Sequence, residues 1–217
     1  GRENFDLASP DQNTQRVAVE GWLTLEASKK LLAAAGQDFA ALKAAASRRD
    51  FCPVAIAAHA NFTINNTTRQ VASKNVVALL PGTDPSRRNE YIIYSAHWDA
   101  FGRNLSLAGD QILNGAADNA TAVGMLLELA RAAATSTANQ RWPRSCLFFF
   151  PTAEEKGLLG SRYYAEHPLY PLSQTLANLN LEPLDSNNAY GPTRDIEVAG
   201  NNPSTIDDIG LAVAAEQ

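Results

Sequence analysis

Apolar and polar residues follow a regular strand-and-helix rhythm from residue 91 to the end of this 217-residue chain. Short runs of β-branched and aromatic residues, typical of buried strands, alternate with stretches whose apolar residues recur at helical spacing. This order predicts an α/β fold with a mixed, largely parallel central sheet flanked by helices. The predicted strands are Tyr91–Tyr94, Ser145–Phe150, Leu176–Leu181 and Ile196–Ala199, and the predicted helices are Asp118–Ala134, Gly160–His167 and a helix from Thr205 onward.

The first ninety residues have a less regular pattern. Leu23–Ala35 has helical periodicity with Thr24 as its candidate N-cap, and Asp38–Ala46 predicts a second short helix. Pro53–Ile64 and Arg69–Leu80 alternate loosely and predict two paired strands that end at a proline-glycine turn. We therefore expect a hairpin before the strand at residue 91.

Composition and charge narrow the class of partners. The chain is 45% hydrophobic and 19% charged, as expected of a globular protein with a substantial core. Its net charge of −5 provides no basic stripe for phosphates, so nucleic acid is not an expected partner. No run approaches the ~18 apolar residues of a membrane span. The polar N-terminus shows no signal-peptide core.

Cysteine chemistry contributes little to the prediction. Cys52 and Cys146 are the only cysteines, too few for a tetrahedral thiolate site. Cys146 stands in an apolar run and is expected to be buried. Whether the two cysteines pair in a disulfide stays open at this point.

Titratable side chains follow three successive predicted strands, or begin the helix after the first of them. Because the carboxyl ends of parallel strands meet at one edge of a sheet, these groups are expected to cluster. Packed carboxylates without a cation would repel one another, and a pair of divalent metal ions is the simplest way to hold them together. Imidazole nitrogen with carboxylate oxygen suits zinc, with manganese or cobalt as substitutes. The side chains are His97, Asp99, Asp118, Glu154, Glu155 and Glu182.

Each of these signals is weak by itself. The pair His97 and Asp99 occurs by chance in many sequences, and Asp118 alone would suit a helix N-cap. Glu154 and Glu155 could complement a helix dipole. The metal-site hypothesis rests on their occurring together, in order, each at a strand end or at the following helix start.

Four segments in this order, HWD, GAADN, PTAEEKGLLGS and NLNLE, resemble motifs of the di-zinc exopeptidases of clan MH. This family includes bacterial leucyl-type aminopeptidases, glutamate carboxypeptidase II, glutaminyl cyclase and the non-catalytic transferrin receptor. The resemblance runs from about Asn75 to the C-terminus and implies the zinc-exopeptidase type of fold. It implies that residues 51–217 are a partial catalytic domain. Within residues 1–50, a segment resembles the one that follows an inserted protease-associated domain.

The resemblance implies a role for each site residue. His97 would bind the first zinc, and Asp99 would accept the other imidazole N–H. Asp118 would bridge two zinc ions, and Glu155 would bind the second. Glu154 would be the general base that takes a proton from the metal-activated water and passes it to the leaving amine.

Two positions depart from the family pattern. Glu182 stands where the family usually has Asp, so its longer carboxylate must complete the first zinc differently, with Asp185 as an alternative ligand. The family also takes a second-zinc histidine from far downstream. The other histidines of this chain, His59 and His167, do not fit that order. The sequence stops within a helix-like run, so we expect a fragment that lacks its C-terminal part and holds the second zinc weakly.

The expected activity is that of a zinc-dependent aminopeptidase acting on peptides. The alternatives are a glutaminyl cyclase-like enzyme with one zinc, or a degenerate receptor-like binding domain, and the fragment itself could be inactive. Carboxypeptidase activity also stays open. The family implies a secreted or periplasmic protein, whereas the sequence indicates neither the oligomeric state nor the preferred substrate side chain.

Overall fold

The computed structural model describes residues 3–9, 17, 19–137, 141–183 and 204–215. It divides into two compact units, Gly1–Leu7 with Ala72–Gln217, and Ala8–Val71. The boundary between the smaller unit and the rest of the larger one therefore follows residue 71. The sequence suggested that the catalytic domain begins at residue 51. The relation of the N-terminal segment to an inserted protease-associated domain stays a prediction.

The smaller unit contains the two predicted helices, α1 (Leu25–Ala34) and α2 (Phe39–Ala46). Both begin at polar caps: the Thr24 hydroxyl and the Asp38 carboxylate each accept an amide hydrogen bond from the first turn, at 3.2 and 2.6 Å. Neither helix contains a buried residue. Local sequence signals therefore explain these helices better than burial does.

The predicted hairpin is wrong. Residues 51–75 form no strand, and only β1 (Val76–Leu80) appears, paired antiparallel with β5 (Ser145–Phe150). Apolar side chains of the supposed first strand remain in solvent, with Phe62 65% and Ile64 56% exposed. The predicted partner strand therefore does not form, and β1 pairs with the central strand β5.

The main sheet has the strand order β1-β5-β2-β6. Here β2 is Tyr91–Ser95 and β6 is Thr175–Asn180; β2 runs parallel to both β5 and β6, and β1 alone is antiparallel. This confirms the mixed, largely parallel sheet. The predicted strand at Ile196–Ala199 lies outside the described residues.

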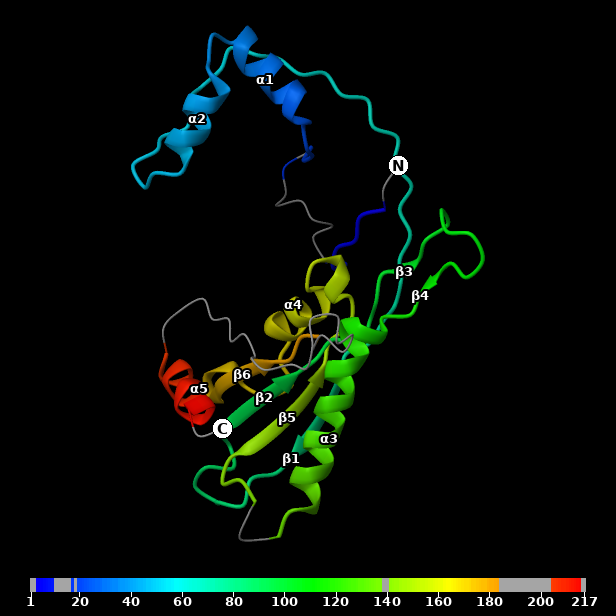
Figure 1. The fold of residues 1–217 in the computed structure, drawn as a ribbon, viewed down its shortest axis with the longest axis vertical. Coiled ribbons are helices and arrows are strands. Elements are labelled where there is room, and N and C mark those ends of the chain that lie inside the picture. Colours follow the sequence, from blue (N-terminus) through cyan, green and yellow to red (C-terminus); the bar gives the residue numbers. More distant parts are fainter. Residues whose placement is uncertain (1–2, 10–16, 18, 138–140, 184–203, 216–217) are drawn as a thin grey trace. The chain divides into compact units, whose positions relative to one another are not determined.

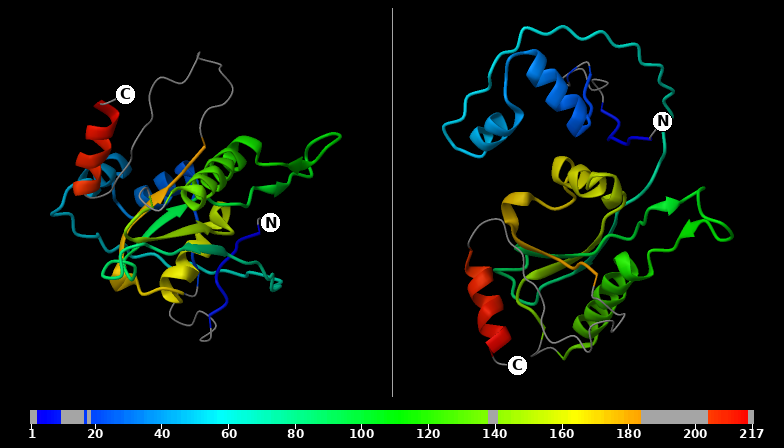
Figure 2. Two further views of the ribbon diagram at one scale, coloured as in Figure 1. Left: turned by 90° about the horizontal axis from the view of Figure 1, so that it is seen from below. Right: turned by 45° about the horizontal axis from the view of Figure 1, so that its top comes forward.

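Helices cover both faces of the sheet (Figures 1 and 2). Leu126 of α3 (Ala122–Thr135) packs against Phe148 and Phe150 on one face. Tyr164 of α4 (Leu159–Glu166) packs with Leu147 and Phe149 on the other. The remaining elements are the short ribbon β3 (Gly102–Arg103) and β4 (Ile112–Leu113), the π-helical turn Ala116–Thr121, the 3₁₀ turns Glu154–Lys156 and Leu172–Gln174, and helix α5 (Thr205–Ala215).

Two further expectations concern membranes and cysteines. Within the described part of the chain, no helix combines the length and the apolar character that crossing a membrane requires. Cys52 is exposed, Cys146 is buried, and both are free thiols.

Candidate metal centre

His97 lies two residues beyond β2 and is almost completely enclosed, with 2% exposure. Strand-like pairing continues past the end of β2. The Ala96 amide donates to the Phe149 carbonyl and the Trp98 amide donates to the Pro151 carbonyl, both at 3.1 Å. The central strands therefore determine the direction of the imidazole.

Asp99 sets the tautomer of that imidazole through its main chain. Nδ1 of His97 lies 3.1 Å from the backbone carbonyl oxygen of Asp99 and 3.6 Å from its carboxylate. A carbonyl oxygen only accepts hydrogen bonds, so Nδ1 carries a proton and Nε2 faces the opposite side. The sequence-based hypothesis assigned this contact to the carboxylate, whereas the carbonyl is the closer acceptor.

The Asp99 carboxylate instead holds the turn that follows β5. Its two oxygens accept hydrogen bonds from the backbone amides of Glu154, at 3.0 Å, and Glu155, at 3.3 Å. These two amides begin a 3₁₀ turn and have no earlier partner within it. Asp99 therefore connects the histidine loop to the glutamate pair.

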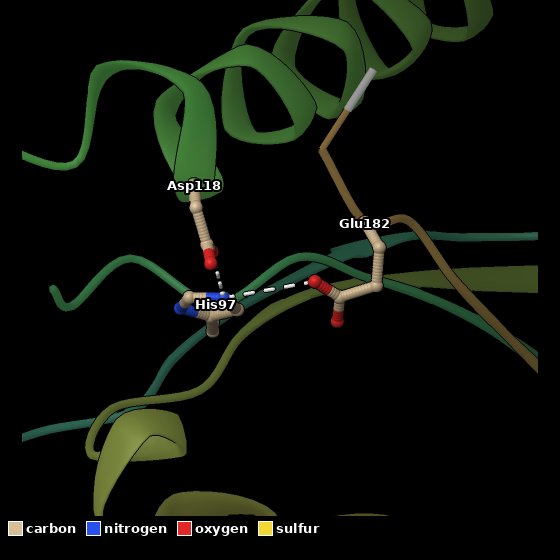
Figure 3. A group of neighbouring side chains, drawn as sticks. All are labelled: His97, Asp118 and Glu182. Atoms are coloured by element: carbon tan, nitrogen blue, oxygen red, sulfur yellow. Dashed lines mark ion pairs between the residues drawn. The ribbon is translucent and has the colours of Figure 1, made fainter. Parts of the chain in front are cut away.

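Three carboxylates surround Nε2 of His97. Asp118 Oδ1 lies 3.0 Å away, Glu182 Oε2 lies 3.7 Å away and Glu154 Oε2 lies 3.8 Å away. Figure 3 shows Asp118 and Glu182 approaching the imidazole from different elements. One ligand atom from each of His97, Asp118 and Glu182 lies within 4.8 Å of the other two, close enough to share one ion.

Asp118 lies in a turn that begins at Gly115. Gly115 has φ +64°, and a Cβ there would lie 2.7 Å from both the Ala100 Cβ and the Asp118 carbonyl oxygen. The π-helical turn that follows has non-helical angles at Asp118, with φ −104° and ψ 99°. The predicted helix therefore starts at Ala122 instead of Asp118, and this irregular turn directs the Asp118 side chain to the centre.

Glu182 lies two residues after β6, at the position that the sequence analysis assigned to it. Sequence reasoning missed two amide side chains that contact Glu182, Asn119 and Asn180. It also missed the Ser95 hydroxyl, which contacts Asn180 and Asn178. A sequence signal for two of them existed: Asn178, Asn180 and Glu182 recur at every second position, so a strand presents them on one face.

Burial raises the pKa values of the two adjacent glutamates. For Glu154, the carboxylates of Glu182, Asp99 and Asp118 add to this rise, whereas His97 opposes it. For Glu155, Asp118 and Glu154 reinforce the effect of burial. Negative charge at this edge of the sheet is therefore destabilised unless a cation or proton compensates it.

The donor set fits zinc. His97 Nε2 faces the oxygens of three carboxylates, and a cation placed among them would accept a lone pair from the imidazole nitrogen and from the carboxylates at once. One nitrogen and carboxylate oxygens are ligands that zinc takes in proteins. In addition, Oε1 of Glu155 is buried and has no hydrogen-bond partner among the described residues. His97, Asp118 and Glu182 would hold one zinc ion.

The second zinc position assigned to Glu155 stays a prediction. Glu155 does not belong to the group formed by His97, Asp118 and Glu182. The ring of His167 stacks on Tyr163, with centroids 4.6 Å apart, at the end of α4. His59 belongs to the unit Ala8–Val71, and the alternative ligand Asp185 lies outside the described residues.

Three known proteins are similar to part of this chain. Mouse aminopeptidase NAALADL1 is 30% identical over 124 residues, which cover 55% of this chain and 15% of the mouse protein. The structure of a zinc aminopeptidase from Bacillus subtilis matches 50% of this chain and 24% of its own, with 26% identity and a TM-score of 0.38. A Zn-dependent exopeptidase from Parabacteroides distasonis matches 50% and 40%, with 23% identity and a TM-score of 0.39.

This chain spans less than half the length of each of these relatives. The family of this chain is assigned by a match to a model of a protein family. The model of Peptidase family M28 matches residues 75–217, which is more than half of the chain and includes every predicted site residue. This chain therefore belongs to peptidase family M28.

Proposed function

We propose that this chain provides the metal site and the general base of a zinc-dependent exopeptidase that removes N-terminal residues from peptides. The observation that carries the proposal is the position of Glu154. Its carboxylate lies 3.8 Å from His97 Nε2, beside the group that fits zinc, and its backbone is held by Asp99. Burial raises the pKa of Glu154, which brings it closer to the pH at which a general base works best.

Glu154 would move the proton during peptide hydrolysis. Its carboxylate accepts a proton from the attacking water as the water oxygen bonds to the scissile carbonyl carbon. It then returns that proton to the amine nitrogen as the C–N bond breaks. When bound by His97, Asp118 and Glu182, zinc supplies Lewis-acid stabilisation for the negative charge that develops on the carbonyl oxygen.

Glu155 would have a different role. It follows Glu154 in a 3₁₀ turn, so the two side chains leave the backbone in different directions. Its buried Oε1, which has no hydrogen-bond partner among the described residues, supports a role for Glu155 in holding a cation. The expected second ion therefore depends on Glu155 and Asp118.

Hydrolysis of aminoacyl-4-nitroanilides tests the proposal. We expect product release that a chelator stops and added zinc restores. Glu154→Gln should lower kcat by about 10²- to 10⁴-fold, because it removes the proton acceptor. Zinc affinity should change little, because Glu154 lies outside the three-residue group.

Other outcomes would overturn this function. Zinc-loaded protein that cyclises N-terminal glutaminyl peptides without hydrolysing nitroanilides would be a cyclase. Zinc-loaded protein that removes only C-terminal residues would be a carboxypeptidase. Failure to bind zinc would favour a degenerate binding domain, and full activity in Glu154→Gln would exclude the proposed proton path.

A further inference from the structure

The carboxylate of Glu182 has two oxygens in different surroundings. Oε1 accepts a hydrogen bond of 2.7 Å from the side-chain amide of Asn180. Oε2 lies 3.7 Å from His97 Nε2 and faces the metal site. Because a carboxylate only accepts hydrogen bonds, the NH₂ group of Asn180 must be the part of the amide that faces Glu182.

Ser95 holds the other end of that amide. Its hydroxyl lies 2.7 Å from Asn180 Oδ1 and 3.0 Å from Asn178 Oδ1. A hydroxyl has a single proton, so the shorter contact, to Asn180, is the stronger candidate for donation. Ser95 is 2% exposed and pairs with Asn180 in the register between β2 and β6. The anchor is therefore a buried group on a rigid inner strand.

Asn119 adds a second link to the same carboxylate. Its side chain is 2% exposed, and its Nδ2 donates to the Leu181 carbonyl at 3.1 Å, with Glu182 Oε2 at 3.5 Å. Asn119 directly follows Asp118. This amide therefore ties the end of β6 to the turn that carries another ligand of the same site.

Glu182 needs such support more than a shorter ligand would. Its side chain is 52% exposed, so packing alone restricts it little. A glutamate also has one more rotatable bond than an aspartate, and ordering that bond costs entropy when a ligand binds. A hydrogen bond that already holds Oε1 removes part of this cost before the metal arrives.

We propose that Asn180 is a positioning residue that orients the Glu182 carboxylate for zinc, and that Ser95 orients Asn180. The inference rests on the proposed zinc site, whose existence is tested separately by the wild-type chain and its His97→Ala variant. Asn180 acts through Glu182 and needs no contact with substrate. Partners of this kind commonly change metal affinity by 10- to 100-fold when they are removed.

The test is zinc affinity of the full chain, measured by competition with a chromogenic chelator. Asn180→Ala and the similarly sized Asn180→Leu should each weaken zinc binding by about tenfold or more. Ser95→Ala should weaken it less, because Asn180 keeps its bond to Glu182. Asn178→Ala is the matched control: it removes an amide from the same strand, and among the described contacts that amide does not reach Glu182. We expect the control to change zinc affinity less than about twofold.

A double-mutant cycle separates positioning from a general structural effect. In the Glu182→Asp background the shorter side chain cannot keep the same contact, so Asn180→Ala should have little further effect on zinc affinity. The visible spectrum of the cobalt-substituted chain should change in Asn180→Leu and stay unchanged in Asn178→Ala. Equal zinc affinity in wild type, Asn180→Ala and Asn180→Leu would overturn the inference, as would an undiminished effect in the Glu182→Asp background. A wild-type chain that binds no zinc, or binds it equally after His97→Ala, would overturn the metal site itself.

Discussion

At the scale of single residues, the centre depends on main-chain geometry as much as on ligand type. The Asp99 carbonyl sets the imidazole tautomer, while the carboxylate of the same residue holds the amides of Glu154 and Glu155. Gly115 permits the turn that carries Asp118. A histidine and carboxylates become a metal site only when such contacts aim them at one point.

Gly115→Ala should therefore damage the metal site. The new Cβ would collide with Ala100 and with the Asp118 carbonyl, and the left-handed backbone would disfavour any side chain. We expect zinc affinity to fall by at least about tenfold, a loss in the range seen when groups that orient metal ligands are removed. Gly109→Ala is the matched control, because Gly109 has φ +76° and open space around its Cβ position. If both variants bind zinc as tightly as wild type, the close approach at Gly115 does not position Asp118.

Ionisation of the Cys146 thiol should lower the free energy of unfolding at alkaline pH. Burial raises the pKa of this thiol from 9.0 to about 11. Its protonated form is favoured in the folded state, so its contribution is present below pH 9 and is lost as pH rises toward 11. The difference between these two pKa values corresponds to a loss of roughly 2 to 3 kcal/mol at most in the free energy of unfolding.

Denaturant titrations from pH 8 to pH 10.5 measure this effect. Cys146→Ala should be less stable at every pH because it leaves a cavity, but its stability should decline less steeply. Tyr94, whose pKa is also raised by burial, is present in both proteins and contributes to both declines. Identical slopes for the two proteins would contradict the assignment to Cys146.

At the scale of elements, β5 and β2 form the rigid centre from which the site is built. All six residues of β5 are buried, and it has neighbours on both sides in the sheet. This agrees with its continuous apolar sequence, since a strand covered on both faces has no polar alternation. The histidine and glutamate loops leave the ends of these two strands, so their position depends on this packing.

Leu147→Ala should destabilise the chain strongly. Leu147 has 0% exposure and packs with Ile93, Phe149 and Tyr164. Loss of a buried leucine side chain typically costs about 2 to 5 kcal/mol. Leu179→Ala on β6 removes the same atoms from a side chain that is 38% exposed, and we expect a clearly smaller loss. Urea unfolding of both variants checks the order, and equal losses would contradict the packing described here.

At the scale of the whole molecule, the sheet topology brings the ligands together. His97 follows β2, Asp118 precedes α3 and Glu182 follows β6, so the ligands are separated along the chain and adjacent in space. An unfolded chain does not hold these atoms together. Zinc should therefore bind the folded state preferentially and stabilise it.

Zinc should raise the unfolding temperature. At free zinc about 100-fold above Kd, the stabilisation is about 2.7 kcal/mol. For a chain of this size that corresponds to a shift of roughly 5 to 10 °C in Tm. Calorimetry with zinc and with a chelator measures the shift, and His97→Ala should abolish it. A rise of the same size in His97→Ala would place the stabilising zinc elsewhere.

Much of the fold was predictable because its signals are local. The bounds predicted for β5 match the structure, and α1 begins at its predicted cap, Thr24. Helix α2 is also present, with Asp38 as its cap instead of its first residue. The hairpin prediction was wrong because Pro53–Ile64 alternates like a strand but forms none, and its apolar side chains Phe62 and Ile64 stay exposed. Whether a segment forms a strand depends on the neighbouring strands it packs against, and its own sequence does not specify those neighbours.

The sequence by itself determined which residue types stand at the strand ends, and hence the zinc-site hypothesis around His97, Asp118 and Glu182. Only the tertiary structure decided how those groups are held: the Asp99 carboxylate on the amides of Glu154 and Glu155, and Ser95 on the Asn180 amide behind Glu182. The physical reason is the separation along the chain of the residues that interact. Periodicity and capping act over a few residues, whereas a ligand's orientation depends on contacts between β2 and β6, which are more than 80 residues apart in the chain.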